Sequence, residues 1–172
     1  VDWNINDNNR LAVRYNYTNN TGWNGPNASS MDGGTRSAYA RTSLYSMAFA
    51  NSMYSMNNLV HTVSLDLNSR INDNLSNQFL ATFSKLDDVR GTNSAEFPFI
   101  DIHDGTNTTT QYMALGYELF TWNNAVHNTH VSIKDDLVYY AGNHKVTMGV
   151  NYEYQMADNA YMRNGTGYYR YK

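Results

Sequence analysis

The residues that most often perform chemistry in enzymes are few in this sequence and poorly spaced for it. His127 and His130 are three positions apart, so on a strand they point to opposite faces and a shared metal would need irregular backbone. Asp101, Asp104 and Gly105 resemble the start of a calcium loop, but no carboxylate follows at the twelfth position. We therefore predict no metal site.

Paired acids are equally unpromising as a catalytic site. Asp87-Asp88 and Asp135-Asp136 are adjacent in sequence, and adjacent side chains on a strand diverge, so neither pair can act as general acid and base. The sequence contains no Gly-x-Ser-x-Gly motif, no phosphate-binding loop and no zinc-protease helix. These observations predict a protein that is not an enzyme, has no catalytic residues and needs no cofactor.

Composition narrows the remaining classes. The net charge is −3, whereas a nucleic-acid binder needs concentrated Lys and Arg to neutralise phosphates, so we expect no nucleic-acid partner. The absence of cysteine excludes disulfide scaffolds. No apolar run approaches the roughly 20 residues of a membrane helix. A membrane β-barrel is not excluded, because its strands alternate apolar and polar residues and contain no long apolar run.

Alternation with a period of two is the strongest pattern in the chain. It is cleanest over 146–156, clear over 11–18 and 59–71, and weaker over 1–5 and 79–85, which predicts antiparallel strands with one apolar face. The stretch 131–139 alternates too, but Asp135 falls on its apolar side. Because a charge facing lipid costs up to roughly 2–4 kcal/mol at mid-membrane, we expect a bulge or a shallow depth near Asp135 and Asp136.

The connections between these strands alternate in length. Short turns near 6–9, 72–75 and 142–144 use Asn, Asp and Gly, which tolerate turn dihedrals, whereas the loops 19–58 and 88–128 far exceed the usual length of about 4–6 residues. Short turns on one rim and long loops on the other are typical of outer-membrane barrels. We therefore predict an all-β fold: an antiparallel meander over residues 1–172 that forms part of a large transmembrane β-barrel with long external loops.

Inside the long loops we expect some local structure. Residues 97–102 and 112–118 are predicted to form a hairpin, and residues 38–56 contain enough Ala, Met and Leu to predict a short helix.

From residue 59 onward, a series of ordered segments carries a family resemblance. The segments are Ser76-Asn77-Gln78-Phe79-Leu80, Asp88-Val89-Arg90-Gly91, Phe97-Pro98-Phe99-Ile100-Asp101-Ile102, Gly116-Tyr117-Glu118-Leu119-Phe120, Asn123-Asn124, Asp135-Asp136-Leu137, Gly142-Asn143-His144-Lys145-Val146-Thr147-Met148-Gly149, Tyr152-Glu153, Asn159 and Tyr168-Tyr169. In this order they resemble the barrel of a TonB-dependent outer-membrane receptor, in particular the Oar-like branch of Bacteroidetes.

The resemblance implies a barrel of about 22 strands in the bacterial outer membrane, plugged by a separate domain and energised through TonB. No plug, TonB-contacting box or carboxypeptidase-regulatory-like domain is visible in these 172 residues. Five or six strands also cannot close such a barrel, and lipid does not tolerate an open edge, so the sheet must pair with further strands. The expected partners are outer-membrane lipid, the plug and TonB.

Two groups of residues are candidates for ligand contact. The polar side of the strands would face the lumen, where it would contact the plug, line the substrate path or simply be solvated; its residues are Arg14, Asn16, Asp66, Asn68, Arg70, Asn151, Glu153 and Gln155. Aromatic residues of the loops would stack on a sugar, grip a peptide or pack the loops; these are Trp23, Tyr39, Tyr45, Phe97, Phe99 and Trp122.

The leading functional hypothesis is ligand capture by the external loops followed by passage through the lumen, without bond chemistry. The ligand class stays open among a small molecule, an oligosaccharide and a peptide. An alternative is a soluble or surface-attached antiparallel β module that binds glycan or protein and packs its apolar face on a second sheet. A third is a barrel that serves as a scaffold or adhesin without transport.

Overall fold

The computed structural model describes residues 1–27, 41–105 and 111–171, which form two compact units. The first unit comprises Val1–Asn19, Leu59–Asp87 and His127–Asp158, and the second comprises Asn20–Asn58, Asp88–Val126 and Asn159–Lys172. Among the described residues, no helix is both long and apolar enough to cross a membrane.

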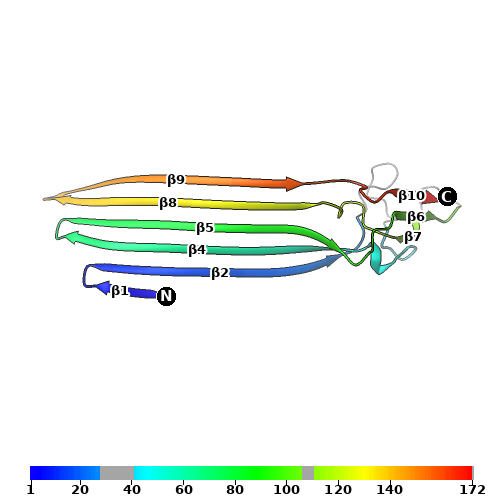
Figure 1. The fold of residues 1–172 in the computed structure, drawn as a ribbon, viewed down its shortest axis with the longest axis horizontal. Coiled ribbons are helices and arrows are strands. Elements are labelled where there is room, and N and C mark those ends of the chain that lie inside the picture. The colour runs from blue at the N-terminus through cyan, green and yellow to red at the C-terminus, as the bar shows by residue number, and fades with distance from the viewer. Residues whose placement is uncertain (28–40, 106–110, 172) are drawn as a thin grey trace. The chain divides into compact units, whose positions relative to one another are not determined.

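Six long or edge strands form the larger sheet. They are β1 (Asp2–Asn6), β2 (Asn9–Asn24), β4 (Tyr54–Asn72), β5 (Leu75–Thr92), β8 (Ala125–Ala141) and β9 (His144–Ala160), and they lie side by side in this order (Figure 1). Two-residue turns at 7–8, 73–74 and 142–143 join β1 to β2, β4 to β5 and β8 to β9. The predicted antiparallel meander is confirmed, and its six strands leave the barrel open at β1 and β9.

The turns form where the sequence supplies residues suited to them. In the last turn Gly142 has φ +59°, a left-handed conformation that glycine adopts without steric cost. In the turn between β4 and β5, the Asn72 side chain accepts a hydrogen bond from the backbone N–H of Asn74 at 2.9 Å, the local bonding that favours Asn in turns.

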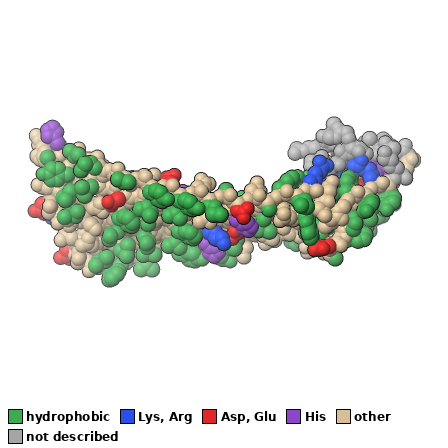
Figure 2. Space-filling model, turned by 45° about the horizontal axis from the view of Figure 1, so that its top comes forward, with side chains coloured by type: hydrophobic (Ala, Val, Ile, Leu, Met, Phe, Trp, Pro, Cys, Tyr) green, Lys and Arg blue, Asp and Glu red, His purple; other side chains and the backbone are tan. Residues whose placement is uncertain are grey.

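The two faces of the larger sheet differ in chemistry, as the alternation predicts. The side that we call the apolar face carries large exposed side chains: Trp3, Ile5, Tyr15, Tyr17, Val63, Leu65, Phe83, Ile133, Val146, Met148, Val150, Tyr152, Tyr154 and Met156. Val150, in the middle of β9, is 73% exposed. Figure 2 shows hydrophobic side chains gathered over this part of the molecule. Among the described residues of the first unit no second sheet covers this face, so the sandwich alternative is not favoured.

Two polar contacts between β5 and β8 lie near the two ends of the apolar face. Near the short turns, Asn77 Nδ2 donates to Asp135 Oδ1 at 2.8 Å, and toward the other end His127 Nδ1 and Asp87 Oδ1 are 2.6 Å apart. Asn77 and Asp87 are ten residues apart in β5, which at the usual strand rise and tilt gives a height of about 25 Å. This height matches a membrane's apolar band. Asp135 thus lies at the level of Asn77, the third residue of β5, which agrees with the expected shallow depth.

The second unit is built around a four-stranded sheet. It contains β3 (Met47–Ala48), β6 (Phe99–His103), β7 (Gln111–Leu115) and β10 (Tyr168–Tyr171), in the order β10-β6-β7-β3. The predicted hairpin is confirmed, because β6 pairs antiparallel with β7. The pairs β10–β6 and β3–β7 are parallel, which the expected meander does not include.

The helix predicted over residues 38–56 is wrong where the structure describes it. Residues 38–40 lie outside the described part, and the remainder holds β3, a single 3-10 turn at Ala50–Ser52 and the start of β4. The Ser52 hydroxyl donates to the Phe49 carbonyl at 2.7 Å. Such side-chain bonds to the backbone compete with helix formation and favour turns.

The strands also reach further than the alternation indicates. β2 continues to Asn24 and β4 begins at Tyr54, while β5 continues to Thr92 and β8 begins at Ala125. Both ends of the predicted loops 19–58 and 88–128 are therefore strand. These extensions are mostly polar or small residues with a few apolar ones such as Trp23 and Tyr54. The backbone ladder therefore continues where neither face needs to be uniformly apolar.

The predicted contact of the apolar face with lipid can be tested at Tyr154. The approach of Gly149 to Asp136 sets the register of β9 against β8, so Tyr154 lies opposite Val131, midway between the levels of Asp135 and His127. Tyr154→Arg should lower the free energy of unfolding by roughly 2–4 kcal/mol, because it places a charge near the middle of the apolar band. Gln155→Arg, the next residue but on the opposite face, should change it by only about 0.5 kcal/mol. The measurement is denaturant unfolding of the protein in lipid vesicles; equal losses for the two variants would contradict the assignment of the faces.

Candidate functional site

The polar face of the larger sheet contains a cleft at the end that carries the short turns. Its volume is about 800 Å³. All six strands of the larger sheet or their turns contribute, and the lining residues are Asn4, Asn6, Asp7, Asn8, Asn9, Arg10, Asn68, Ser69, Arg70, Ser76, Asn77, Gln78, Asp136, Val138, Lys145 and Thr147. Amide and hydroxyl groups dominate this surface, which suits contact with a polar partner or with water.

The charges of the cleft are partly paired. Arg10 Nη2 lies 3.4 Å from Asp2 Oδ1, and Arg70 Nη2 lies 2.5 Å from Asp73 Oδ1; both are exposed ion pairs. Such exposed pairs contribute only about 0–1 kcal/mol each, so they leave the arginines free to rearrange. Lys145 Nζ lies 5.8 Å from the centroid of the Tyr140 ring.

Some of the polar residues that were predicted to face the lumen lie together at this cleft. Asn68 and Arg70 line it, and Asp66 Oδ1 accepts hydrogen bonds from Asn68 at 2.9 Å and from Gln78 at 3.1 Å.

The other predicted lumen residues do not line the cleft. Asn151 donates to Glu153 at 3.2 Å within β9. Arg14 and Asn16 on β2, and Gln155 on β9, share the polar face by alternation.

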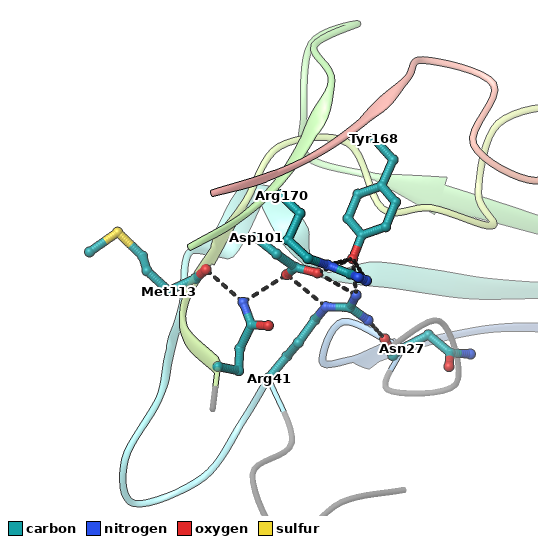
Figure 3. A network of polar contacts seen from close by, with 7 residues as sticks. Asn27, Arg41, Asp101, Met113, Tyr168 and Arg170 are labelled. Carbon is teal, nitrogen blue, oxygen red and sulfur yellow. Dashed lines mark hydrogen bonds and ion pairs between the residues drawn. The ribbon is translucent and has the colours of Figure 1, made fainter. Parts of the chain in front are cut away.

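A buried ion pair organises the second unit (Figure 3). Arg41 and Asp101 are 0% and 1% exposed, and two bonds join them: Nε to Oδ1 at 2.9 Å and Nη2 to Oδ2 at 2.6 Å. Gln111 donates to Oδ1 at 2.7 Å and the Tyr168 hydroxyl donates to Oδ2 at 2.5 Å. Because the Asp101 carboxylate is fully used by these donors, the calcium loop that its spacing suggested does not form around it.

Burial raises the pKa of the Tyr168 hydroxyl, and its hydrogen bond and proximity to Asp101 raise this pKa further. Tyr168 therefore stays protonated at neutral pH and remains a hydrogen-bond donor to Asp101. The same hydroxyl accepts a hydrogen bond from Arg170 Nη2 at 2.6 Å. The network consequently joins β6, β7 and β10 to the segment around Arg41, which is 60 residues from Asp101 in sequence.

A second buried carboxylate lies in the same unit. Glu118 is 1% exposed, and its Oε2 accepts from Arg90 at 2.8 Å and from the Thr121 hydroxyl at 2.7 Å. The Arg90 guanidinium also lies 3.7 Å from the centroid of the Tyr54 ring. Sequence reasoning did not single out Arg41, Arg90 or Glu118; the one available signal was a lone charge inside the apolar run Gly116-Tyr117-Glu118-Leu119-Phe120.

The predicted ligand-binding aromatics separate into exposed and buried groups. Trp23, Tyr45 and Phe97 are 49%, 69% and 45% exposed. Trp122 is half-buried and packs edge-on against Tyr117 at 5.9 Å. Tyr39 lies outside the described residues.

Phe99 is the exception among these aromatics, and its predicted ligand contact is wrong in this structure. It is fully buried in the core of the second unit with Ala114, Leu119 and Phe120. Burial alternates along β6: Phe99 faces inward, and the next residue, Ile100, faces the other side of the strand.

That other side forms an apolar surface that sequence reasoning missed. In register, Tyr169 pairs with Ile100 and Ile100 with Leu115, while Tyr171 pairs with Ile102, Ile102 with Met113 and Met113 with Met47. Since paired residues share a face, these seven side chains form one uncharged patch, which we call the loop platform. Tyr169, Tyr171 and Met47 are each more than half exposed.

The buried pair gives a direct prediction for the second unit. Asp101→Asn should destabilise this unit by roughly 3–5 kcal/mol, because removal of one partner leaves Arg41 buried without a counter-charge. Hydrogen exchange of the β6 amides reports the loss as faster exchange. Glu96→Gln, an exposed acid of the same unit, is the matched control and should change protection little. Unchanged exchange in Asp101→Asn would show that the pair does not hold the unit together.

Comparison with known proteins agrees with this architecture. A family model described as "Outer membrane beta barrel domain" matches residues 1–172. No curated protein matches the chain, and no solved structure does.

Proposed function

Because this chain belongs to the outer membrane beta barrel domain family and is located in the bacterial outer membrane, we propose that it is a barrel segment of a TonB-dependent receptor, of the Oar-like kind. The ordered series of segments from Ser76 to Tyr169 supports this finer assignment. The observation that carries the proposal is the division of the sheet into an exposed apolar face and a polar face with a cleft of about 800 Å³.

Each face has a role in the proposed mechanism. The apolar face contacts outer-membrane lipid, and the polar face surrounds the lumen, where the amide-rich cleft contacts the plug domain. Polar side chains with weak, exposed ion pairs suit this task, because they exchange partners when the plug moves. TonB supplies the energy for that movement, and the substrate crosses by binding and gated passage without bond chemistry.

The second unit is the proposed site of ligand capture. Its long connections, 25–53 and 93–124, leave the strands at the end opposite the short turns, which is the external end in outer-membrane barrels. The loop platform, together with exposed Trp23, Tyr45 and Phe97, offers aromatic rings and flexible methionines. Such side chains favour a ligand with apolar surface, whether a small molecule, a peptide or the ring faces of an oligosaccharide.

Energy coupling is tested by uptake into cells. Fluorescently labelled oligosaccharide and oligopeptide pools are given to cells with the receptor, without it, and with TonB inactivated. We expect surface binding to need the receptor, and accumulation to need both the receptor and TonB. Accumulation that continues without TonB would contradict the transport proposal, and binding without any receptor-dependent accumulation would favour a scaffold or adhesin.

Ligand capture is tested on the loop platform. Tyr169→Ala combined with Tyr171→Ala should weaken surface binding of the responsive pool by about tenfold, since each lost aromatic contact costs roughly 0.5–1.5 kcal/mol. Tyr161→Ala is the control, because Tyr161 is equally exposed in the same unit but lies outside the four-stranded sheet. Equal effects of the two changes would exclude the platform as the capture surface.

A further inference from the structure

Titratable side chains gather on the apolar face of the first unit at one level. Lys85 and Asp87 extend from β5 and His127 from β8; Lys85 Nζ lies 3.7 Å from Asp87 Oδ2, and His127 Nδ1 lies 2.6 Å from Asp87 Oδ1. Figure 2 shows a small group of basic, acidic and histidine side chains where the hydrophobic area of this sheet ends.

His61 belongs to the same level on the neighbouring strand β4. The Thr62 hydroxyl bonds the Ser84 hydroxyl at 2.8 Å, and the Asn58 amide donates to Asp88. These two contacts fix the register of β4 against β5, so His61 lies opposite Lys85. We call His61, Lys85, Asp87 and His127 the rim cluster.

The rim cluster marks the outer limit of the apolar band. On the same face, Phe83 precedes Lys85 in β5 and Val63 follows His61 in β4, and both are exposed apolar side chains. The cluster lies at the end of the band away from the short turns, which is the external end of an outer-membrane barrel. Its side chains therefore meet the headgroups of the outer leaflet rather than the acyl chains.

The donors of the cluster are only partly used within the protein. Lys85 is half-exposed and its distance from Asp87 is long for an ion pair, so its ammonium keeps donors for another acceptor. Within the described part of the chain, His127 is bound to Asp87 through Nδ1 alone. His61 Nδ1 bonds the Tyr15 hydroxyl at 2.8 Å, and the Tyr17 ring lies 5.1 Å from the imidazole.

Acidic groups limit where an anion can bind. Asp87 separates Lys85 from His127. On β9, Asp158 falls opposite His127, because the approach of Gly149 to Asp136 sets the register of β8 against β9. The side of the cluster farther from Asp158 is therefore the pair Lys85 and His61.

We propose that Lys85 and His61, supported by the Tyr15 hydroxyl, bind the phosphate of a phosphorylated glycolipid in the outer leaflet. Charge-assisted hydrogen bonds to phosphate are the strongest that these donors can form. The apolar band beside the cluster receives the acyl chains of the same molecule, so the site continues a surface that already faces lipid. This continuity favours a lipid over free phosphate, which would gain nothing from Phe83 and Val63. The site is independent of the transported ligand.

The test is binding of diphosphoryl lipid A to the purified protein in detergent micelles, quantified by native mass spectrometry. Lys85→Gln should weaken binding about fivefold, as expected for one cationic contact to an anionic lipid, and Lys85→Gln with His61→Gln about tenfold. Lys134→Gln, a half-exposed lysine of the polar face that does not line the cleft, should stay within about twofold of the unchanged protein. Heat-dependent migration in gels verifies that each variant keeps its barrel.

Two further probes identify the group that is bound. Dephosphorylated lipid A should bind more weakly than the diphosphoryl form and should not distinguish Lys85→Gln from the unchanged protein. Inorganic phosphate should not displace lipid A. The proposal is overturned if the double variant binds lipid A like the unchanged protein, if dephosphorylated lipid A binds as well as the diphosphoryl form, or if inorganic phosphate alone competes.

Discussion

The structure depends on one constraint: within hydrocarbon no water is present to satisfy backbone N–H and C=O groups. Strands can cross only when each is paired on both sides, and their side chains must then alternate between lipid and a polar interior. In the order β1-β2-β4-β5-β8-β9, four of the six strands are hydrogen-bonded on both sides, and β1 and β9 are edge strands with one unpaired side. Nearly all of β9 is exposed. The sheet is therefore stable as part of a larger closed barrel and not by itself.

The same constraint explains what the sequence could predict. Where one face must be apolar, apolar and polar residues alternate along the strand. The strands around Leu65, Ile133 and Val150, and the direction of their side chains, could therefore be predicted from the sequence. Beyond the apolar band both faces tolerate polar residues, so alternation fades while backbone pairing continues. This is why the ends of β2 at Asn24 and of β4 at Tyr54 were assigned to loops.

Contacts between distant residues were beyond sequence reasoning. Sequence reasoning compared Asp101 only with the start of a calcium loop, which it rejected. The counter-charge of Asp101 is Arg41, 60 residues away, and nothing local to either residue indicates the other. Gly149 is similar: a Cβ there would lie 2.2 Å from Asp136 Oδ1, so a side chain on the neighbouring strand β8 is what requires glycine at this position. Phe99 was expected to meet ligand because it is aromatic and in a loop, but its place in β6 decided its burial.

The second unit buries a charged network beside its apolar core and exposes an apolar surface, and these two features are connected. Its inner side buries Arg41 and Asp101 and partly buries Tyr168, while its outer side exposes the loop platform. A buried ion pair adds little net stability, but it is intolerant of displacement, so it fixes which segments meet. Tyr168 is held by Asp101, and alternation along β10 then sets the direction of Tyr169. Exposed apolar surface costs free energy unless a partner covers it, and here the buried network is what keeps that surface in one defined shape.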